Sequence, residues 1–144
     1  MRELITIQLG QCGNQIGRQF WQQALEEHAR HCEGGSTFDA PMSAFFRNVD
    51  ARTIPPRTLA LGSPISSLRA RAVLIDMEES VVAETLRSPL GELFESHQYV
   101  TDVSGSGNNW AHGHALYGPQ YADSIGDSVR ATLEARPLPF VSFV

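Results

Sequence analysis

The sequence lacks the features that several classes of protein require. Cysteine is scarce: Cys12 and Cys32 are the only two in 144 residues, too few for a disulfide framework and in keeping with a reducing compartment. No apolar run approaches the roughly 20 residues of a transmembrane helix. The N-terminus also lacks the basic and apolar regions of a signal peptide. We therefore expect a cytoplasmic protein with no membrane contact.

Basic residues are outnumbered by acidic ones. There are 11 lysines and arginines against 16 aspartates and glutamates, which gives a formal net charge of -5 at pH 7. A protein that binds nucleic acid without regard to sequence, or that binds an anionic membrane, needs a basic face. We therefore expect neither nucleic acid nor membrane among the partners.

The chain does have enough apolar residues for one domain. Its 144 residues are 42% hydrophobic, which allows a buried core. Residues 137–144 form an apolar strand pattern with no turn or capping sequence after it. We therefore expect residues 1–144 to be the N-terminal part of a single domain that is cut off in mid-fold, with no second domain.

The most informative stretch is a glycine-rich turn at residues 10–17, GQCGNQIG. It follows a strand pattern over 4–9, with Ile5, Ile7 and Leu9 on one side, and precedes a predicted helix over about 11–30. A helix N-terminus offers unpaired N–H groups and partial positive charge, and glycine lets an anion approach the backbone. This arrangement commonly binds phosphate; the alternative is a tight turn that only packs helix on strand.

The glycine spacing in this turn, Gly-x-x-Gly-x-x-x-Gly, matches neither the dinucleotide fingerprint nor a P-loop. No lysine lies within it. A phosphate here would be held by backbone N–H groups and polar amides, with help from a metal ion. The helix that follows repeats apolar residues every four positions on one face: Ile16, Phe20, Ala24 and His28, with Trp21 and Leu25 beside them.

The rest of the chain alternates strands and helices after a long irregular region, 36–64, in which short strand or helix pieces remain an open alternative. The continuous apolar run over 72–75 predicts a strand buried on both faces. We expect a strand over 70–76, helices over about 80–87 and 90–96, a strand over 99–103 and helix from about 109. A further helix is expected over about 119–135, with Tyr121, Ile125, Val129 and Leu133 on one face. A final strand follows it. This order predicts an α/β fold, a parallel sheet with helices on both faces.

Three polar or glycine-rich turns fall at the carboxyl ends of the predicted strands, where α/β sheets bind ligands. They are the turn at 10–17, Asp76-Met77-Glu78, and the loop over 104–109. If the strand geometry persists, Asp76 and Glu78 point the same way, and carboxylates near phosphate favour Mg²⁺. The alternatives are helix N-capping by the carboxylates and a plain loop with a cap for 104–109.

Together these turns resemble the three nucleotide loops of tubulins, in the same order. The residues that carry the resemblance are 10–17 (GQCGNQIG), 70–78 (ARAVLIDME) and 105–111 (GSGNNWA), with Gly113-His114 after them. Within the family, residues 45–50 (FFRNVD), 76–79 (DMEE) and 101–107 (TDVSGSG) look most like the epsilon class. The resemblance covers essentially the whole chain.

The resemblance implies a Rossmann-like GTPase domain of the tubulin/FtsZ type, truncated after about its fourth main strand, that binds GTP or GDP with Mg²⁺. It assigns no catalytic residue. In the first turn the resemblance implies that Gly10, Gln11, Cys12 and Gln15 lie at the nucleotide, with the N–H groups of Gln11 and Cys12 on phosphate. In the second turn it implies that Glu78 lies near the phosphates and Mg²⁺, with Asp76 beside it. In the third turn it implies Gly105, Ser106, Gly107 and Asn108, of which Ser106 and Asn108 contact phosphate and ribose.

The implied partners are other tubulin subunits in microtubules or centrioles, and the implied location is the cytoskeleton and centrosome. The family's next glycine- and threonine-rich loop and its base contacts are not in this chain. We therefore expect residues 1–144 to bind GTP weakly and to lack a complete hydrolytic site. The alternatives are an FtsZ-like division GTPase and a Rossmann-type oxidoreductase, which fails on the glycine spacing and on the missing acidic residue about 20 positions beyond the turn.

Overall fold

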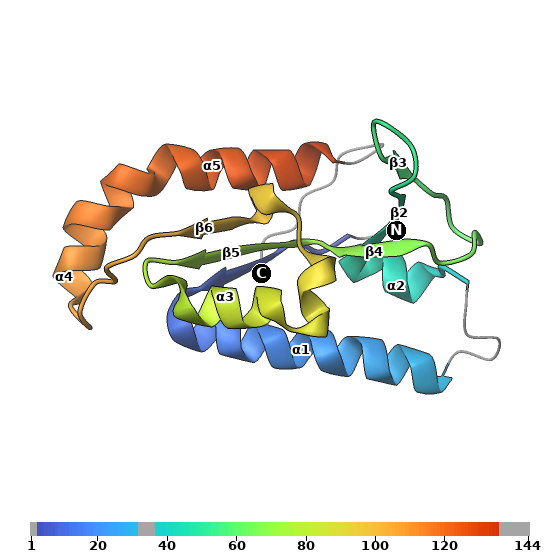
Figure 1. Ribbon diagram of the computed structural model, residues 1–144, viewed down its shortest axis with the longest axis horizontal. Coiled ribbons are helices and arrows are strands. Elements are labelled where there is room, and N and C mark those ends of the chain that lie inside the picture. The colour runs from blue at the N-terminus through green and yellow to red at the C-terminus, as the bar shows by residue number, and fades with distance from the viewer. Residues whose placement is uncertain (1–2, 32–36, 136–144) are drawn as a thin grey trace.

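The fold is built on a three-stranded parallel sheet (Figure 1). A computed structural model describes residues 3–31 and 37–135 of the chain. In it β1 (Thr6–Leu9), β5 (Ala72–Asp76) and β6 (Tyr99–Thr101) pair in parallel in the order β1-β5-β6. The strand predicted at 137–144 lies outside the described residues. The parallel sheet and the central position of the apolar run at 72–75 confirm the sequence-based prediction.

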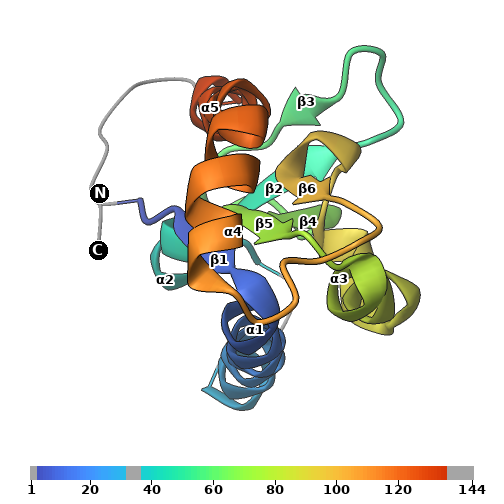
Figure 2. The ribbon, with the colours of Figure 1, turned by 90° about the vertical axis from the view of Figure 1, so that its left-hand side faces the viewer.

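Helices cover both faces of this sheet (Figures 1 and 2). On one face lie α1 (Gly10–His31), α3 (Glu79–Arg87) and the short 3₁₀ helix η1 (Pro89–Leu93). On the other face α5 (Gly118–Glu134) packs on β5 and β6. The bounds of α1 and α3 agree closely with the predicted helices. No helix in the described part of the chain combines the length and the apolar character that crossing a bilayer requires.

The core lies between α1 and β5. Trp21 of α1 is completely buried, and its ring packs edge-on against Phe46 and Phe94, with ring centroids 5.4 and 6.3 Å apart. The residues of β5 from Ala72 to Ile75 are at most 4% exposed. Such burial on both faces is what a continuous apolar strand requires.

The predicted apolar face of α1 is wrong at its N-terminal end. Ile16 is 65% exposed and Phe20 is 36% exposed. The buried residues of α1 are Asn14, Gly17 and Trp21. Close packing on β1 explains the difference, because the side that faces the strand at this end has room only for a glycine and a hydrogen-bonded amide.

In β1 the buried side chain is polar and the exposed side chains are apolar, which is the reverse of an ordinary half-buried strand. Gln8 is 6% exposed, whereas Ile7 and Leu9 are 46% and 68% exposed. Gln8 faces α1, and α5 on the opposite face covers β5 and β6. The apolar side chains of β1 are therefore left open within the described part of the chain.

Gly17 lies where α1 packs closely on the Gln8 side chain of β1. A Cβ built there would lie 2.1 Å from the side-chain oxygen of buried Gln8. We expect Gly17→Ala to lower the free energy of unfolding by about 1–3 kcal/mol, because the amide must be displaced. Gly126→Ala is the control: its Cβ would meet nothing within 4 Å beyond its own helix neighbours, so helix propensity should raise stability by about 0.5–1 kcal/mol. Urea denaturation checks both, and equal effects would contradict the packing role.

The region 36–64 was expected to be irregular with room for short strand or helix pieces, and the described part of it contains such pieces, although their pairing into a sheet was not predicted. After α2 (Ala40–Phe45), the strands β2 (Phe46–Asp50), β3 (Arg57–Thr58) and β4 (Ser67–Ala70) form an antiparallel sheet in the order β3-β2-β4. The sheet lies at the end of the molecule away from the carboxyl ends of β1, β5 and β6 (Figure 1). Its central strand buries polar residues, so no hydrophobic alternation marks it.

Buried Asn48 shows how β2 satisfies its polar groups. Its side-chain nitrogen donates to the carbonyl of Pro64 at 2.8 Å, and its oxygen accepts from the N–H of Ser66 at 2.9 Å. Both partners lie in the segment that leads into β4. Hydrogen bonds, rather than apolar contacts, thus fix this part of the small sheet.

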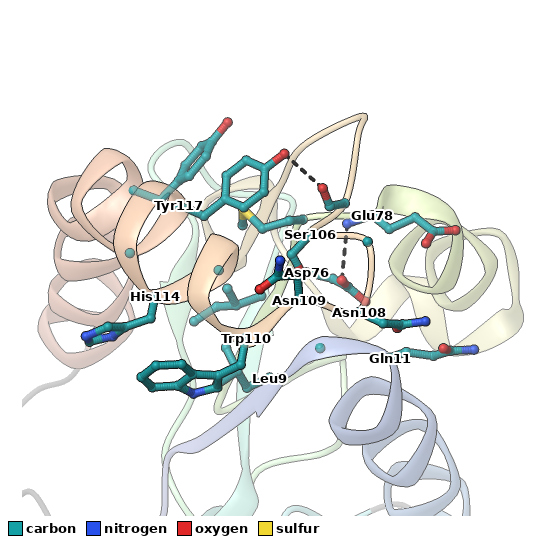
Figure 3. A pocket seen from close by; sticks show the side chains of 18 of the residues that line it. Leu9, Gln11, Asp76, Glu78, Ser106, Asn108, Asn109, Trp110, His114 and Tyr117 are labelled. Carbon is teal, nitrogen blue, oxygen red and sulfur yellow. Dashed lines mark hydrogen bonds between the residues drawn. The ribbon is translucent and has the colours of Figure 1, made fainter.

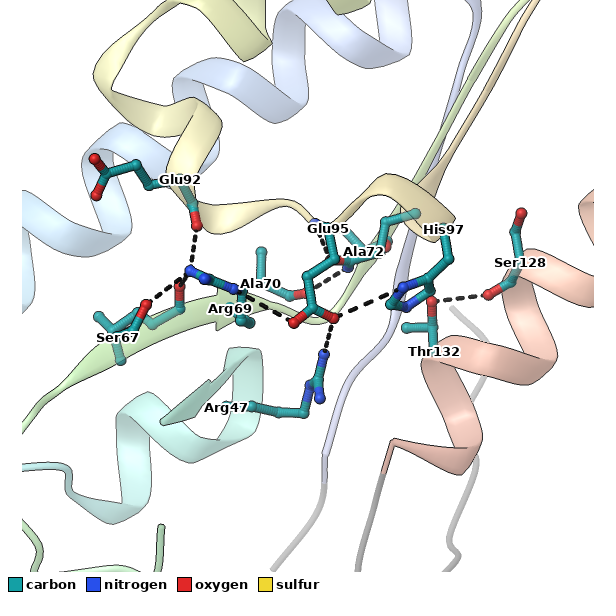
Figure 4. A network of polar contacts seen from close by, with 12 residues as sticks. Arg47, Ser67, Arg69, Ala70, Ala72, Glu92, Glu95, His97, Ser128 and Thr132 are labelled. Carbon is teal, nitrogen blue, oxygen red and sulfur yellow. Dashed lines mark hydrogen bonds and ion pairs between the residues drawn. The ribbon is translucent and has the colours of Figure 1, made fainter. Parts of the chain in front are cut away.

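A polar network joins the small sheet to the segment that leads into β6 (Figure 4). Glu95 pairs with Arg47 at 3.0 Å, with Arg69 at 3.4 Å and with His97 at 3.7 Å. Gln98, in the 3₁₀ helix η2 (Ser96–Gln98), is completely buried and donates to the carbonyls of residues 70 and 72, both at 2.7 Å. These carbonyls flank the point where the chain passes from one sheet to the other.

The last helical part is continuous where two helices were predicted. A turn of α4 (Trp110–His112) leads into a π-helix, η3 (Gly113–Tyr117), and then into α5. Pro119 lies in the first turn of α5, directly after the π-turn, a position at which proline is well tolerated. The predicted start of the last helix at about Pro119 is confirmed as the start of α5, and the preceding helical turns run into it without a break.

Candidate functional site

A cavity of about 650 Å³ lies at the carboxyl ends of the three parallel strands (Figure 3). The turn from β1 into α1, the turn after β5 and the loop after β6 all line it, as predicted. The predicted residues that line it are Gly10, Gln11, Asp76, Glu78, Gly105, Ser106, Gly107 and Asn108. Cys12 and Gln15 are exposed on α1 and do not line it, so their contacts stay predictions.

The first turn is as short as a strand-to-helix turn can be. β1 ends at Leu9 and α1 begins at Gly10, whose φ of 69° favours glycine. The first turn of α1 contains no acidic residue, and the side chain of Gln11 makes no hydrogen bond within the described residues. Gly10 and Gln11 at this helix end line the cavity, and the first turn of their helix holds nothing negative that would compete for its N–H groups.

Asn14 ties the first turn to the second. Its side-chain nitrogen donates to the carbonyl of Gly10 at 2.9 Å and to that of Ile75 at 3.2 Å, and the residue is 1% exposed. Sequence reasoning missed this role. The one sign of this role in the sequence was a single amide side chain on the side of the predicted helix that faces the strand.

The second turn leaves one carboxylate oxygen without a partner. Strand geometry ends at Asp76, whose Oδ1 accepts the N–H of Glu78 at 3.1 Å. Its Oδ2 is buried and has no hydrogen-bond partner in the described part of the chain. Glu78 is the N-cap residue of α3 but makes no side-chain capping bond; instead its Oε1 accepts from Ser80 at 2.9 Å. Capping therefore does not explain the two carboxylates.

These carboxylates fit the requirements of Mg²⁺. Mg²⁺ usually takes one or two protein carboxylates and completes its shell with water and phosphate oxygens. The unpartnered oxygen of Asp76 and the cavity-lining carboxylate of Glu78 supply that number. Among the described residues no three His, Cys, Asp or Glu side chains form a site that would hold a metal alone. A cation here would depend on a second, anionic ligand.

The third turn leaves two polar side chains free. Gly105, Gly107 and Asn108 have φ values of 59°, 60° and 56°, so the loop adopts a backbone that favours glycine and asparagine. Asn109, and not Asn108, caps the next helix, by accepting the N–H of His112 at 3.3 Å. Within the described residues the side chains of Ser106 and Asn108 make no hydrogen bond, and both line the cavity.

Backbone hydrogen bonds join the second and third turns. The N–H of Asp102 donates to the carbonyl of Asp76 at 3.3 Å, and that of Gly105 donates to Met77 at 2.8 Å. A Cβ on Gly105 would lie 3.7 Å from Oε2 of Glu78, so the loop lies against this carboxylate. The three turns thus form one connected surface.

Sequence reasoning missed the side of the cavity that α5 and the preceding helical turns provide. Tyr117, Tyr121 and Ile125 line that side. Trp110 and His114 stack with ring centroids 4.7 Å apart at the end opposite Gln11 and Asn108 (Figure 3). Tyr121 and Ile125 were predicted to share an apolar helix face, and that periodicity was the signal for their inward position.

Tyr121 and Asp102 shift each other's pKa. The hydrogen bond from the Tyr121 hydroxyl to Asp102 raises the pKa of Tyr121 above its usual value of about 10. The same bond, with the N–H of Val103, lowers the pKa of Asp102. A pKa that differs between the folded and unfolded states makes stability depend on pH. The stability that Tyr121 contributes is complete below about pH 10 and is lost as the pH rises through its folded-state pKa. The stability that Asp102 contributes is present above about pH 4 and is lost as the pH falls through its folded-state pKa.

We expect a near-ultraviolet titration to show Tyr121 ionising above the usual tyrosine range. In Asp102→Ala the pKa of Tyr121 should fall toward 10, because its hydrogen bond and the nearby negative charge are both removed. Tyr121→Phe identifies the titration step by deleting it. An unchanged high-pH step in Asp102→Ala would contradict the assignment.

Proteins that hold phosphate groups at such turns form a large class of α/β domains, and this chain has their arrangement. Comparison with known proteins makes the class specific. Residues 3–142 match the Tubulin/FtsZ family, GTPase domain, and the chain belongs to that family. This confirms the resemblance drawn from the three turns, and it argues against a Rossmann-type oxidoreductase.

Individual relatives point in the same direction. The chain is 50% identical over 134 residues to the tubulin epsilon chain of Mus musculus and 49% identical to that of Homo sapiens. It is 34% identical over 139 residues to the tubulin beta chain of Schizophyllum commune. Each comparison covers 93% of this chain and 28% of the relative, so the chain spans about a quarter of the length of these proteins.

Proposed function

We propose that the cavity binds the phosphates of GTP or GDP, with Mg²⁺ held near Glu78. The observation that carries the proposal is the meeting of three turns from three neighbouring parallel strands around one cavity. Membership of a GTPase-domain family supports guanine as the base. In this proposal the described turns form the phosphate end of the site.

The charge of the cavity explains why a metal ion is needed. No arginine or lysine is among the described residues that line it, whereas Asp76 and Glu78 are. Two carboxylates beside a triphosphate repel it unless a cation lies between them. In this proposal the N–H groups at the start of α1 and the free side chains of Ser106 and Asn108 bind phosphate oxygens, and Mg²⁺ neutralises the rest.

Isothermal titration of the full-length protein with GTP tests the proposal. We expect saturable binding in Mg²⁺ that is at least tenfold weaker when EDTA removes the metal, for the electrostatic reason above. ATP and NAD serve as competitors and should not displace GTP at equal concentration. No GTP binding in Mg²⁺, or preferred binding of NAD, would contradict the proposal.

We further infer that the full-length protein is a structural subunit that assembles with other tubulins in microtubules or centrioles. Its similarity to tubulin epsilon chains and to a tubulin beta chain supports this. Relatives named as tubulins favour this function over that of an FtsZ-like division GTPase. A fluorescent fusion should concentrate at centrioles or the centrosome; a division ring would favour the alternative, and a diffuse cytoplasmic signal would contradict the assembly role.

A further inference from the structure

The loop over residues 102–109 has little regular structure to hold it. It contains three residues with positive φ, at 105, 107 and 108, and no strand of the described ranges 3–31 and 37–135 pairs with it. On the side of β5 two backbone hydrogen bonds fix it, from Asp102 and from Gly105. A glycine-rich loop with so few bonds samples many conformations unless other groups restrain it.

On the opposite side two tyrosines hold the loop. Tyr117 is 8% exposed, and its hydroxyl bonds both Ser104 Oγ at 2.7 Å and the carbonyl of Gly105 at 3.0 Å. Tyr121, one helical turn further on, donates to the Asp102 carboxylate. The two rings lie on the same helix face, 6.1 Å apart between centroids.

The two tyrosines bind different parts of the loop. Tyr121 fixes its beginning at Asp102, and Tyr117 fixes the middle at Ser104 and Gly105. Neither uses Ser106 or Asn108, whose side chains are the polar groups left free toward the cavity. Asp102 itself does not line the cavity, and its charge is engaged by Tyr121 and by the N–H of the following residue, 2.6 Å away.

We propose that Tyr117 and Tyr121 are positioning residues that hold the loop over 102–109 in its ligand-binding shape before the nucleotide arrives. This inference rests on the function proposed above, and it deepens it by naming what orders one of the three turns. A loop that is ordered in advance loses less conformational entropy on binding, so the tyrosines raise the affinity by holding the loop. They belong to the helix, and the groups they position belong to the loop.

The first measurement needs no nucleotide. Hydrogen exchange of the unliganded full-length protein should show residues 102–109 exchanging about tenfold faster in Tyr117→Phe and in Tyr121→Phe, as expected for the loss of one or two hydrogen bonds. Exchange within β5 should not change. Tyr99→Phe is the matched control, because the Tyr99 ring packs against the hydrophobic core and its hydroxyl makes no hydrogen bond within the described residues.

A conservative variant separates the hydrogen bond from mere bulk. Asp102→Asn keeps an acceptor for Tyr121 and should retain most of the loop protection, whereas Asp102→Ala should match Tyr121→Phe. The double variant Tyr121→Phe/Asp102→Ala should be no worse than either single variant, since both remove the same bond. Ser104→Ala removes one bond of Tyr117 without touching its buried ring, and it carries the test if Tyr117→Phe does not fold.

The second measurement is GTP affinity in Mg²⁺. We expect it to fall about fivefold to tenfold in the two tyrosine variants and to stay unchanged in Tyr99→Phe. Loop exchange that does not change would overturn the inference even if GTP binds, and so would faster exchange with unaltered affinity. If the wild-type protein binds no GTP while the loop still loses protection, the proposed function fails, and the anchoring of the loop is supported apart from it.

Discussion

Replacing Glu95 by alanine should lower the free energy of unfolding by about 3 kcal/mol. Breaking a buried ion pair by removing one partner costs about 3–5 kcal/mol, because the other charge stays buried without compensation. Arg47 is 7% exposed and Arg69 is 20% exposed, and Glu95 neutralises both (Figure 4). The Glu95 side chain is itself 31% exposed, which places the effect at the lower end of the range.

Urea denaturation followed by far-ultraviolet circular dichroism measures this effect. Glu92→Ala is the matched control, because Glu92 is exposed and only its backbone carbonyl accepts from Arg69. It should change stability by less than about 0.5 kcal/mol. A loss below about 1 kcal/mol in Glu95→Ala would mean that water satisfies the two arginines, and that the junction of the two sheets does not depend on this network.

Replacing Glu78 by alanine should weaken GTP binding about 10–100-fold in Mg²⁺, the range that metal-site substitutions typically produce. In EDTA the same variant should bind GTP as well as the wild type or better, because one negative charge beside the phosphates is gone. The opposite response in the two conditions is the signature of a metal-linked carboxylate.

Glu79→Ala is the control for charge alone. Glu79 is exposed in the first turn of α3, next to Glu78 in sequence, and it does not line the cavity. Its replacement should leave the affinity for GTP unchanged within a factor of two or so. An equal loss for Glu78→Ala in Mg²⁺ and in EDTA would show that Glu78 shapes the turn through Ser80 and does not act through a metal.

The strand-turn-helix order could be predicted because its signals are local. The apolar run at 72–75 and the turn at 10–17 each carry their pattern within a few residues. The same patterns placed three turns at one sheet edge, and the structure brings them around one cavity. Fold class and the general position of the site therefore followed from the sequence.

The small sheet could not be predicted, for a physical reason. β2 buries Arg47 and Asn48, and their partners Glu95 and Pro64 lie far along the chain. Polar residues become suitable for a buried strand only when those partners are in place. Hydrophobic periodicity alone therefore predicts a loop for this region.

The same limit applies to the site. Tyr117 and Tyr121 fit an apolar helix face, and their hydroxyl groups acquire a role only from contact with a loop 12 to 19 residues earlier. Asn14 was part of a recognised turn, yet its side chain joins two turns through a bond across 61 residues. Long-range hydrogen bonds, rather than residue types, decide which side chains hold the turns and which remain free.

Identifying the nucleotide that copurifies with the full-length protein tests the central claim most directly. The protein would be purified without added nucleotide, denatured, and its small molecules identified by mass spectrometry. The account predicts GTP or GDP, close to one per chain, with a reduced amount in Glu78→Ala. A nicotinamide or adenine nucleotide in its place, or no nucleotide in protein that is folded and pure, would contradict it.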